Sequence, residues 1–167
     1  MRHQAKALFL DRDGTLIEHI PYLHDPAKVR LLPGAQAALR EAMAAGFRLF
    51  LFTNQSGVGR GMFDMEAVEA CNRRMLELLD LPEPGFTRIC VAPEAPDAES
   101  HYRKPSPRFI DEMIEVHGLD REACWMVGDS ECDRLAAKNA GIRSIQVGPG
   151  ASLRDAVWPI LNTDGGL

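Results

Sequence analysis

The sequence predicts an α/β fold, a Rossmann-like three-layer sandwich in which helices cover both faces of a central parallel sheet. Short apolar runs alternate with helical stretches along the chain, which is the rhythm of such a fold. The runs are almost wholly apolar, as strands buried on both faces should be. With 167 residues, 46% of them apolar, the chain suits one domain spanning residues 1–167.

Five runs are the expected strands: Lys6–Leu10, Phe47–Phe52, Phe86–Val91, Cys124–Val127 and Arg143–Val147. Four helices are expected between them, over residues 34–45, from 65 onward, 107–117 and 131–140. Gly46, Gly118 and Gly141 follow three of these helices and suit left-handed C-terminal caps. Asp64 and Ser106 are the expected N-caps of the second and third helices.

The segments between these elements predict loops. Residues 18–32 lack a helical period, and Pro21, Pro26 and Pro33 indicate a turn-rich flap that is too short for a separate cap domain. Residues 94–101 and the tail after Ile160 are also expected to be loops.

The charge balance excludes some classes of partner. A net charge of -5 leaves no basic excess for a nucleic-acid backbone or an anionic membrane. The apolar run Ala7–Leu10 is too short for a signal peptide or a membrane span, so a cytoplasmic protein is expected. The four cysteines form no C-x-x-C pair, and we expect buried, reduced thiols at Cys71, Cys90, Cys124 and Cys132.

Polar clusters stand close to the C-terminal ends of the expected strands, where open α/β sheets bind their ligands. They are Asp11–Thr15, Thr53–Gly57, Arg103–Pro105 and Gly128–Asp133. Each cluster taken alone has an ordinary interpretation, because a single Asp at a strand end usually caps a turn or a helix. Their coincidence at one edge predicts a functional site.

The acidic residues of these clusters indicate a metal site. Two unit charges about 4 Å apart repel by roughly 4 kcal/mol at an effective dielectric constant of about 20. If Asp11, Asp13 and Asp129 converge, they therefore need a compensating cation. Oxygen ligands alone favour Mg²⁺.

A carboxylate beside such a cation can attack phosphorus. We expect Asp11 to be the nucleophile and Asp13, two residues later, to be the general acid and base. Gly14 would let the backbone leave the strand tightly, bringing amides toward phosphate oxygens. An ordinary turn glycine is an equally good interpretation of Gly14.

Further candidates bind the phosphoryl group. The Thr53 hydroxyl and the Asn54 backbone amide can donate to its oxygens, and Lys104 can neutralise its charge. The glycine-rich run of residues 57–61 lacks the spacing of a dinucleotide or P-loop motif and is expected to be a loop carrying Arg60.

With these clusters in this order, the chain resembles the haloacid dehalogenase (HAD) superfamily of phosphohydrolases over nearly its whole length. The segments D-R-D-G-T, T-N-Q-S-G, R-K-P and G-D-S-E-C-D resemble its four motifs. The resemblance implies a HAD-like fold in which Asp11 is the nucleophile, Asp13 the acid and base, and Asp133 a support for the metal site. It implies Mg²⁺ held by Asp11, the Asp13 carbonyl and Asp129, and phosphate bound at Thr53, Asn54 and Lys104.

Within the superfamily the likeness is to the capless branch, subfamily III, which contains heptose-bisphosphate and histidinol-phosphate phosphatases. The phrases F-L-D-R-D-G-T-L, T-N-Q-S-G-V-G-R-G and R-K-P-S-P carry this likeness, and Arg103 resembles a distal-phosphate contact. That branch usually has a zinc loop with a C-x-H and a C-x-C pair. Cys90 keeps its position, but Ala92, Ser100 and Tyr102 replace the other ligands, so no structural zinc is expected.

The combined hypothesis is a monomeric, Mg²⁺-dependent phosphatase acting through a phospho-aspartate on a small metabolite such as D-glycero-D-manno-heptose 1,7-bisphosphate. Arg60 and Arg103 are candidate contacts to the rest of the substrate. Histidinol-phosphate phosphatase is one alternative. A nucleic-acid 3′-phosphatase is another, which the acidic charge disfavours. A non-catalytic phosphate-binding module is the third, which the intact set of Asp and Lys residues disfavours.

Overall fold

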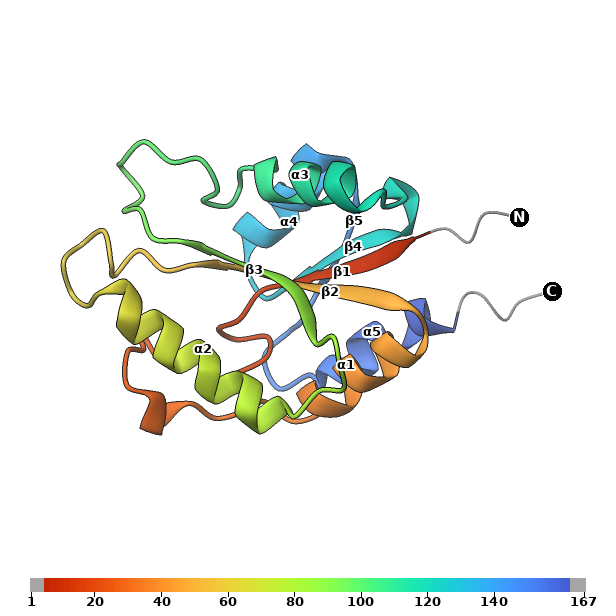
Figure 1. The fold of residues 1–167 in the computed structure, drawn as a ribbon, viewed down its shortest axis with the longest axis horizontal. Helices are drawn as coiled ribbons and strands as arrows, with labels where there is room; N and C mark the ends of the chain where they lie inside the picture. Colours follow the sequence, from red (N-terminus) through yellow and green to blue (C-terminus); the bar gives the residue numbers. More distant parts are fainter. Residues whose placement is uncertain (1–4, 163–167) are drawn as a thin grey trace.

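The structure is a computed structural model that describes residues 5–162. One parallel sheet has the strand order β3-β2-β1-β4-β5. Its strands are β1 (Lys6–Leu10), β2 (Phe47–Asn54), β3 (Phe86–Ala92), β4 (Cys124–Gly128) and β5 (Arg143–Gln146). Helices α3 (Arg108–His117) and α4 (Glu131–Ala140) cover one face, and α1 (Ala35–Ala44), α2 (Met65–Leu79) and α5 (Leu153–Leu161) cover the other (Figure 1). The predicted three-layer α/β sandwich is confirmed.

Alternation along the central strands builds a hydrophobic core on each face of the sheet. In a strand, every second side chain points to the same face. Leu49 and Leu51 of β2 therefore pack with α1, α2 and α5, whereas Phe50 and Phe52 pack with α3 and α4. The Phe50 ring stacks on that of Phe9 with 4.9 Å between the ring centroids. Burial on both faces explains why these runs are almost wholly apolar.

Most of the predicted helix ends are found. Asp64 caps α2 by accepting a hydrogen bond from the Ala67 amide at 2.9 Å, and Gly118 and Gly141 end α3 and α4 in the left-handed conformation. The predicted N-cap of α3 was wrong by one residue. Pro107 occupies that position, although the Ser106 hydroxyl accepts a hydrogen bond from the Arg108 amide at 3.3 Å.

Helix α5 was not predicted from the sequence. Pro159 lies inside it, and a proline in a helix interior removes one backbone hydrogen bond. Leu153, Val157 and Ile160 nevertheless share one face and are buried in the core that includes α1. Tertiary packing therefore stabilises a helix that local sequence disfavours. Of the tail predicted as a loop, Leu161 belongs to α5, and residues 163–167 lie outside the described residues.

The flap of residues 18–32 is turn-rich, as predicted. A short 3₁₀ turn, Pro26–Lys28, and a bridge between Ile17 and Leu31 are its regular features. Leu23 and Val29 are buried in the core with α1 and α2, which anchors the flap to the body of the protein. Residues 94–101 form a loop, also as predicted.

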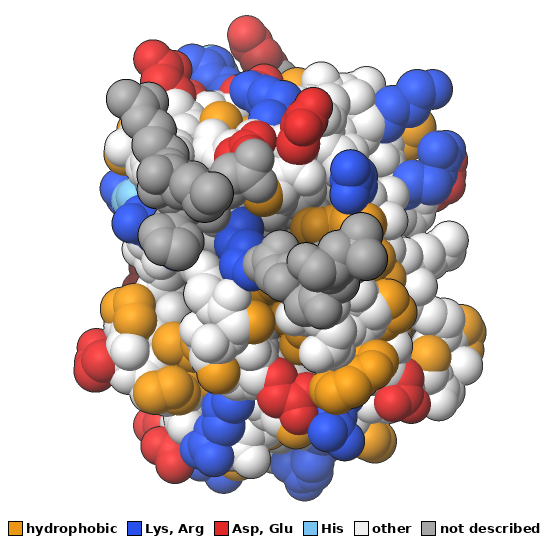
Figure 2. Space-filling model, turned by 90° about the vertical axis from the view of Figure 1, so that its right-hand side faces the viewer, with side chains coloured by type: hydrophobic (Ala, Val, Ile, Leu, Met, Phe, Trp, Pro, Cys, Tyr) orange, Lys and Arg blue, Asp and Glu red, His pale blue; other side chains and the backbone are white. Residues whose placement is uncertain are grey.

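Figure 2 views the molecule from the side on which β1 begins, where acidic and basic side chains of the described residues are interspersed. Within residues 5–162, every helix is too short or too polar to cross a membrane. Cys71, Cys90 and Cys124 are buried free thiols, as predicted, but Cys132 is only partly buried.

Candidate active site

Three carboxylates converge at the C-terminal edge of the sheet. Asp11 follows β1, Asp129 follows β4, and Asp133 lies in the first turn of α4. One oxygen from each carboxylate lies within 4.8 Å of the other two. Strands β1 and β4 are neighbours in the sheet, so their parallel pairing places Asp11 and Asp129 side by side although they are distant in sequence.

Two glycines make room for these carboxylates. Gly14 has a φ of +82°, and a Cβ added there would lie 2.0 Å from Oδ2 of Asp129. A Cβ added at Gly128 would lie 2.1 Å from Oδ2 of Asp133. Both contacts are far shorter than a van der Waals separation, so the carboxylates occupy space that any other residue would fill. Gly14 is therefore required by the site as well as by the turn.

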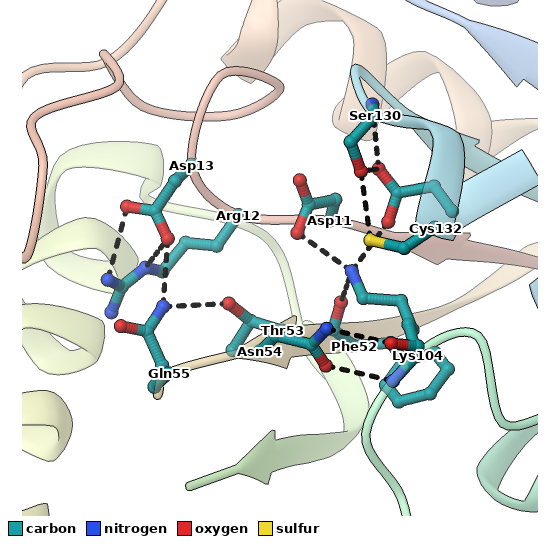
Figure 3. Close-up of polar contacts among 11 residues, drawn as sticks. Asp11, Arg12, Asp13, Phe52, Thr53, Asn54, Gln55, Lys104, Ser130 and Cys132 are labelled. Atoms are coloured by element: carbon teal, nitrogen blue, oxygen red, sulfur yellow. Dashed lines mark hydrogen bonds and ion pairs between the residues drawn. The ribbon is translucent and has the colours of Figure 1, made fainter. Parts of the chain in front are cut away.

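Lys104 lies at the centre of the acidic cluster and is only 2% exposed. Its Nζ donates to Oδ1 of Asp11 at 2.9 Å and to the Phe52 carbonyl at 2.7 Å (Figure 3). It also donates to Oδ1 of Asp133 at 2.6 Å. These acceptors match the three protons of an ammonium group. Burial alone lowers the pKa of Lys104, but Asp11 and Asp133 outweigh it and raise the pKa above its usual value. Lys104 is therefore a fixed positive charge.

Asn54, the last residue of β2, holds the Lys104 backbone in place. Its side-chain oxygen accepts from the Lys104 amide at 3.0 Å, and its side-chain nitrogen donates to the Lys104 carbonyl at 3.2 Å (Figure 3). This reciprocal pair joins the loop before α3 to the sheet. The sequence predicted that the Asn54 backbone amide binds the phosphoryl group. In the structure, the Asn54 side chain also has a role, because its hydrogen bonds define the position of Lys104.

The pKa of Asp11 is raised in the buried site, and a further cation would oppose this shift. Burial raises the pKa of Asp11 to about 8; Lys104 opposes this shift, while Asp133 and Asp13 add to it. The raised pKa favours the protonated carboxyl, which is a poor nucleophile. A divalent cation beside Asp11 would favour its ionised form.

The donor atoms at this point suit a hard divalent cation such as Mg²⁺, which prefers oxygen ligands. Asp11 and Asp129 both contribute carboxylate oxygens to the cluster. Asp133 is engaged by Lys104 and also accepts from the amide and hydroxyl of Ser130, at 3.1 and 2.8 Å. Asp11 and Asp129 are therefore the better candidates for direct ligands, with Asp133 holding Lys104 and the start of α4.

The Asp13 side chain is not part of this cluster. Its carboxylate accepts from Nε and Nη2 of Arg12, both at 3.1 Å, and from Nε2 of Gln55 at 2.8 Å (Figure 3). The expected convergence of Asp11, Asp13 and Asp129 side chains thus needs correction, because Asp133 takes the place expected for Asp13. The predicted metal contact of Asp13 concerns its carbonyl and stays a prediction.

A cavity of about 420 Å³ opens at the site. Asp11, Asp13, Asn54, Lys104 and Asp129 line it together with Gln55, Ser130, Cys132, Phe63 and flap residues 19–23. Among the described lining residues, Lys104 is the sole Lys or Arg. Thr53 is fully buried and is not among the lining residues. It is connected to the lining by Gln55, whose Nε2 donates to the Thr53 hydroxyl at 2.8 Å.

The two arginines predicted to contact substrate lie outside this lining. Arg60 is exposed in the loop after β2, as predicted for that loop, and the Arg103 guanidinium donates to the Glu94 carbonyl at 3.3 Å. In contrast, sequence reasoning missed Arg12, which is fully buried behind Asp13, and Gln55. Arg12 lies in the motif D-R-D-G-T and Gln55 in the motif T-N-Q-S-G, and these positions are the signal in the sequence that could have identified them.

Hydrogen bonds stabilise the loop before α3, where no structural zinc is expected. The Tyr102 hydroxyl donates to Glu112 at 2.8 Å, and the Ser100 hydroxyl accepts from the Arg103 amide at 3.0 Å. Cys90 is buried in β3, and burial raises the pKa of its thiol to about 12. Tyr102 and Ser100 therefore have hydrogen-bond partners within the protein, and Cys90 is a buried thiol. The absence of a structural zinc stays a prediction.

Comparison with known proteins identifies the class. A HAD-hydrolase-like family model matches residues 101–159. A D-glycero-beta-D-manno-heptose-1,7-bisphosphate 7-phosphatase from Rhodopseudomonas palustris is 36% identical over 143 residues, which span 81% of this chain and 79% of the relative. The chain belongs to the HAD-like hydrolases, and it is an enzyme of the phosphatase class.

Other relatives are similar over most of this chain. A crystal structure of D,D-heptose 1.7-bisphosphate phosphatase from B. bronchiseptica, complexed with magnesium and phosphate, aligns with a TM-score of 0.84 and 28% identity, covering 95% of this chain and 99% of that one. The histidine biosynthesis bifunctional protein HisB from Campylobacter jejuni subsp. jejuni is 32% identical over 146 residues. These residues span 86% of this chain and 42% of that protein.

Proposed function

We propose that this phosphatase depends on Mg²⁺ and forms a phospho-aspartate on Asp11. The observation that carries the proposal is the position of Asp11, whose carboxylate lines the cavity, contacts the buried ammonium of Lys104 and lies beside Asp129. An anionic nucleophile and an anionic phosphate repel each other unless positive charge lies between them. Lys104 supplies one such charge permanently.

The proposed reaction has two steps. First, an Asp11 oxygen attacks phosphorus, the ester P–O bond breaks, and Asp13 gives its proton to the leaving oxygen. Second, Asp13 takes a proton from water, whose oxygen attacks the phosphorus, releasing phosphate and the Asp11 carboxylate. Mg²⁺, held by Asp11, Asp129 and the Asp13 carbonyl, would screen the negative charges of Asp11 and the phosphoryl group. Gly14 and Asp133 support this arrangement.

Phosphoryl oxygens are proposed to bind at the end of β2 and beside Lys104. The Thr53 hydroxyl and the Asn54 amide donate to them, and Lys104 balances the charge that develops on them. Asn54 contributes a second time, since its side chain fixes the Lys104 backbone.

The proposed substrate is a small phosphorylated metabolite such as D-glycero-D-manno-heptose 1,7-bisphosphate, the substrate named for several relatives. Binding of its second phosphate requires Arg60 or Arg103 to turn toward the cavity. One observation favours histidinol phosphate instead. The lining combines Asp11, Asp13 and Asp129 with a single Lys or Arg among the described residues, and this negative balance suits an ammonium-bearing substrate.

Phosphate release tests the proposal. Wild-type protein and Asp11→Asn are assayed with heptose 1,7-bisphosphate, histidinol phosphate and a panel of sugar phosphates, with Mg²⁺ and with a chelator. Asp11→Asn should lower kcat/KM by about 10⁴-fold or more, because removal of a nucleophile abolishes the first step. Asp97→Asn, at an exposed loop position, is the matched control and should retain activity.

Acid-quenched wild-type protein should also carry a phosphoryl group that Asp11→Asn lacks. Equal phosphate release by wild type and Asp11→Asn, or full activity in the chelator, would contradict the proposal. The preferred substrate is decided by the ratio of kcat/KM for the heptose bisphosphate to that for histidinol phosphate.

A further inference from the structure

Gln55 connects the end of β2 to the Asp13 carboxylate. Its Nε2 donates to the Thr53 hydroxyl and to Oδ2 of Asp13, both at 2.8 Å (Figure 3). An amide NH₂ has two protons, so these two bonds use its whole donor capacity. Thr53 is fully buried and Gln55 is only 6% exposed, so the connection starts from a rigid part of the sheet.

The other side of Asp13 is held by Arg12. Nη2 of Arg12 donates to Oδ1 of Asp13 and Nε donates to Oδ2, while Nη1 donates to the side chain of Asn72 on α2 at 2.9 Å. Arg12 is fully buried and Asn72 is 5% exposed. Both oxygens of Asp13 are therefore fixed, and Gln55 is the link that ties them to the strand carrying Thr53 and Asn54.

The direction of the Asp13 side chain matters because it lines the same cavity as Asp11. A general acid works only when its proton lies within hydrogen-bond reach of the leaving oxygen. A carboxylate at the end of a short loop has several rotamers, and most of them would miss that atom. Hydrogen bonds to buried groups select one rotamer among them.

We propose that Gln55 is a positioning residue that holds the Asp13 carboxyl in the orientation from which it protonates the leaving oxygen. This inference rests on the proposed function, in which the Asp13 proton moves to the leaving oxygen as the P–O bond breaks and Asp11 takes up the phosphoryl group. A basic leaving group such as an alkoxide needs that proton, whereas 4-nitrophenolate departs readily without it. Loss of Gln55 therefore slows esters of basic alcohols selectively.

The experiment compares two esters of similar shape, benzyl phosphate and 4-nitrophenyl phosphate, through kcat/KM, which includes the bond-breaking step and excludes later hydrolysis. In Gln55→Met, which keeps side-chain length but has no donor, kcat/KM for benzyl phosphate should fall about tenfold further than for 4-nitrophenyl phosphate. Gln55→Glu, which also lacks the amide protons, should show the same selectivity. Gln36→Met is the matched control, because Gln36 donates at 2.9 Å to the Leu79 carbonyl, a backbone group of α2.

The melting temperatures of the variants separate positioning from stability. An equal fall for both esters, or no fall in either Gln55 variant, would overturn the inference. Unfolding of both variants would assign Gln55 to stability alone and also overturn it. Failure of the proposed function looks different, since wild-type protein would then release no phosphate from any ester, or Asp11→Asn would release as much as wild type.

Discussion

Replacing Lys104 by Met tests the electrostatics of the site most directly. The substitution keeps an unbranched side chain but removes the ammonium, and with it three hydrogen bonds to Asp11, Asp133 and the Phe52 carbonyl. Asp11 and Asp133 then face each other in a buried site without their cation. Lys104 is 2% exposed, so water cannot take over the lost interactions.

The expected loss of stability is about 3–5 kcal/mol, the usual cost of breaking a buried ion pair by removing one partner. The loss should depend on pH in a defined direction. Lys104 lowers the pKa of Asp11, so this pKa rises without it, and a protonated Asp11 does not repel Asp133. The cost of the substitution is therefore largest at alkaline pH, where Asp11 is ionised, and shrinks as the pH falls.

Urea unfolding of wild type and Lys104→Met, at several pH values and with and without Mg²⁺, measures this effect. Mg²⁺ should recover part of the loss, because it replaces positive charge beside Asp11. Lys138→Met, at an exposed position of α4, is the matched control and should change stability by less than about 0.5 kcal/mol. A loss below about 1 kcal/mol for Lys104→Met, or one that grows toward acid pH, would refute the reasoning.

Further predictions concern Mg²⁺ binding, Gly14 and the pKa of Asp11. Gly14→Ala combines a left-handed φ with a clash against Asp129, so it should weaken Mg²⁺ binding in calorimetry and cost more stability than Gly61→Ala. Gly61 has a φ of +73° and open space around it, and equal effects at both positions would contradict the clash. Burial raises the pKa of Asp11 from 3.8 to about 8, so metal-free stability is full below the lower value and falls as the pH rises toward the upper one. Mg²⁺ affinity should rise over the same window by up to about tenfold per pH unit, because binding requires the ionised carboxylate, and Asp11→Asn should show no such slope.

The sequence was sufficient for most of the architecture. Strand β1 was predicted with its observed bounds, and the other strands differ from prediction by one or two residues at their C-terminal ends. Apolar runs with a two-residue alternation and glycines after helices are local patterns, and local patterns fix secondary structure when they agree with burial. Helix α5 was not predicted, because Pro159 lies inside it and disfavours a helix. The packing of Leu153 and Val157 in the core stabilises the helix nevertheless.

For the site, motif order indicated the correct edge of the sheet. Asp11, Lys104 and Asp129 were named from sequence, and the parallel topology brings them together since strand ends share one edge. The sequence could not decide which carboxylates face one another. Asp13 and Asp133 are both short acidic side chains near Asp11, and their directions depend on partners from other elements.

What the sequence determined by itself, then, is the order of strands and helices along the chain and the kinds of side chain that reach the sheet edge. What only the tertiary structure decided is how those side chains are paired. Arg12 and Gln55 bind the Asp13 carboxylate, and Lys104 binds both Asp133 and Asp11. The physical reason is that a buried charge must be paired, and the fold determines which oriented partners are available. Gln55, which binds Asp13, and Lys104, which binds Asp133, both come from distant parts of the chain.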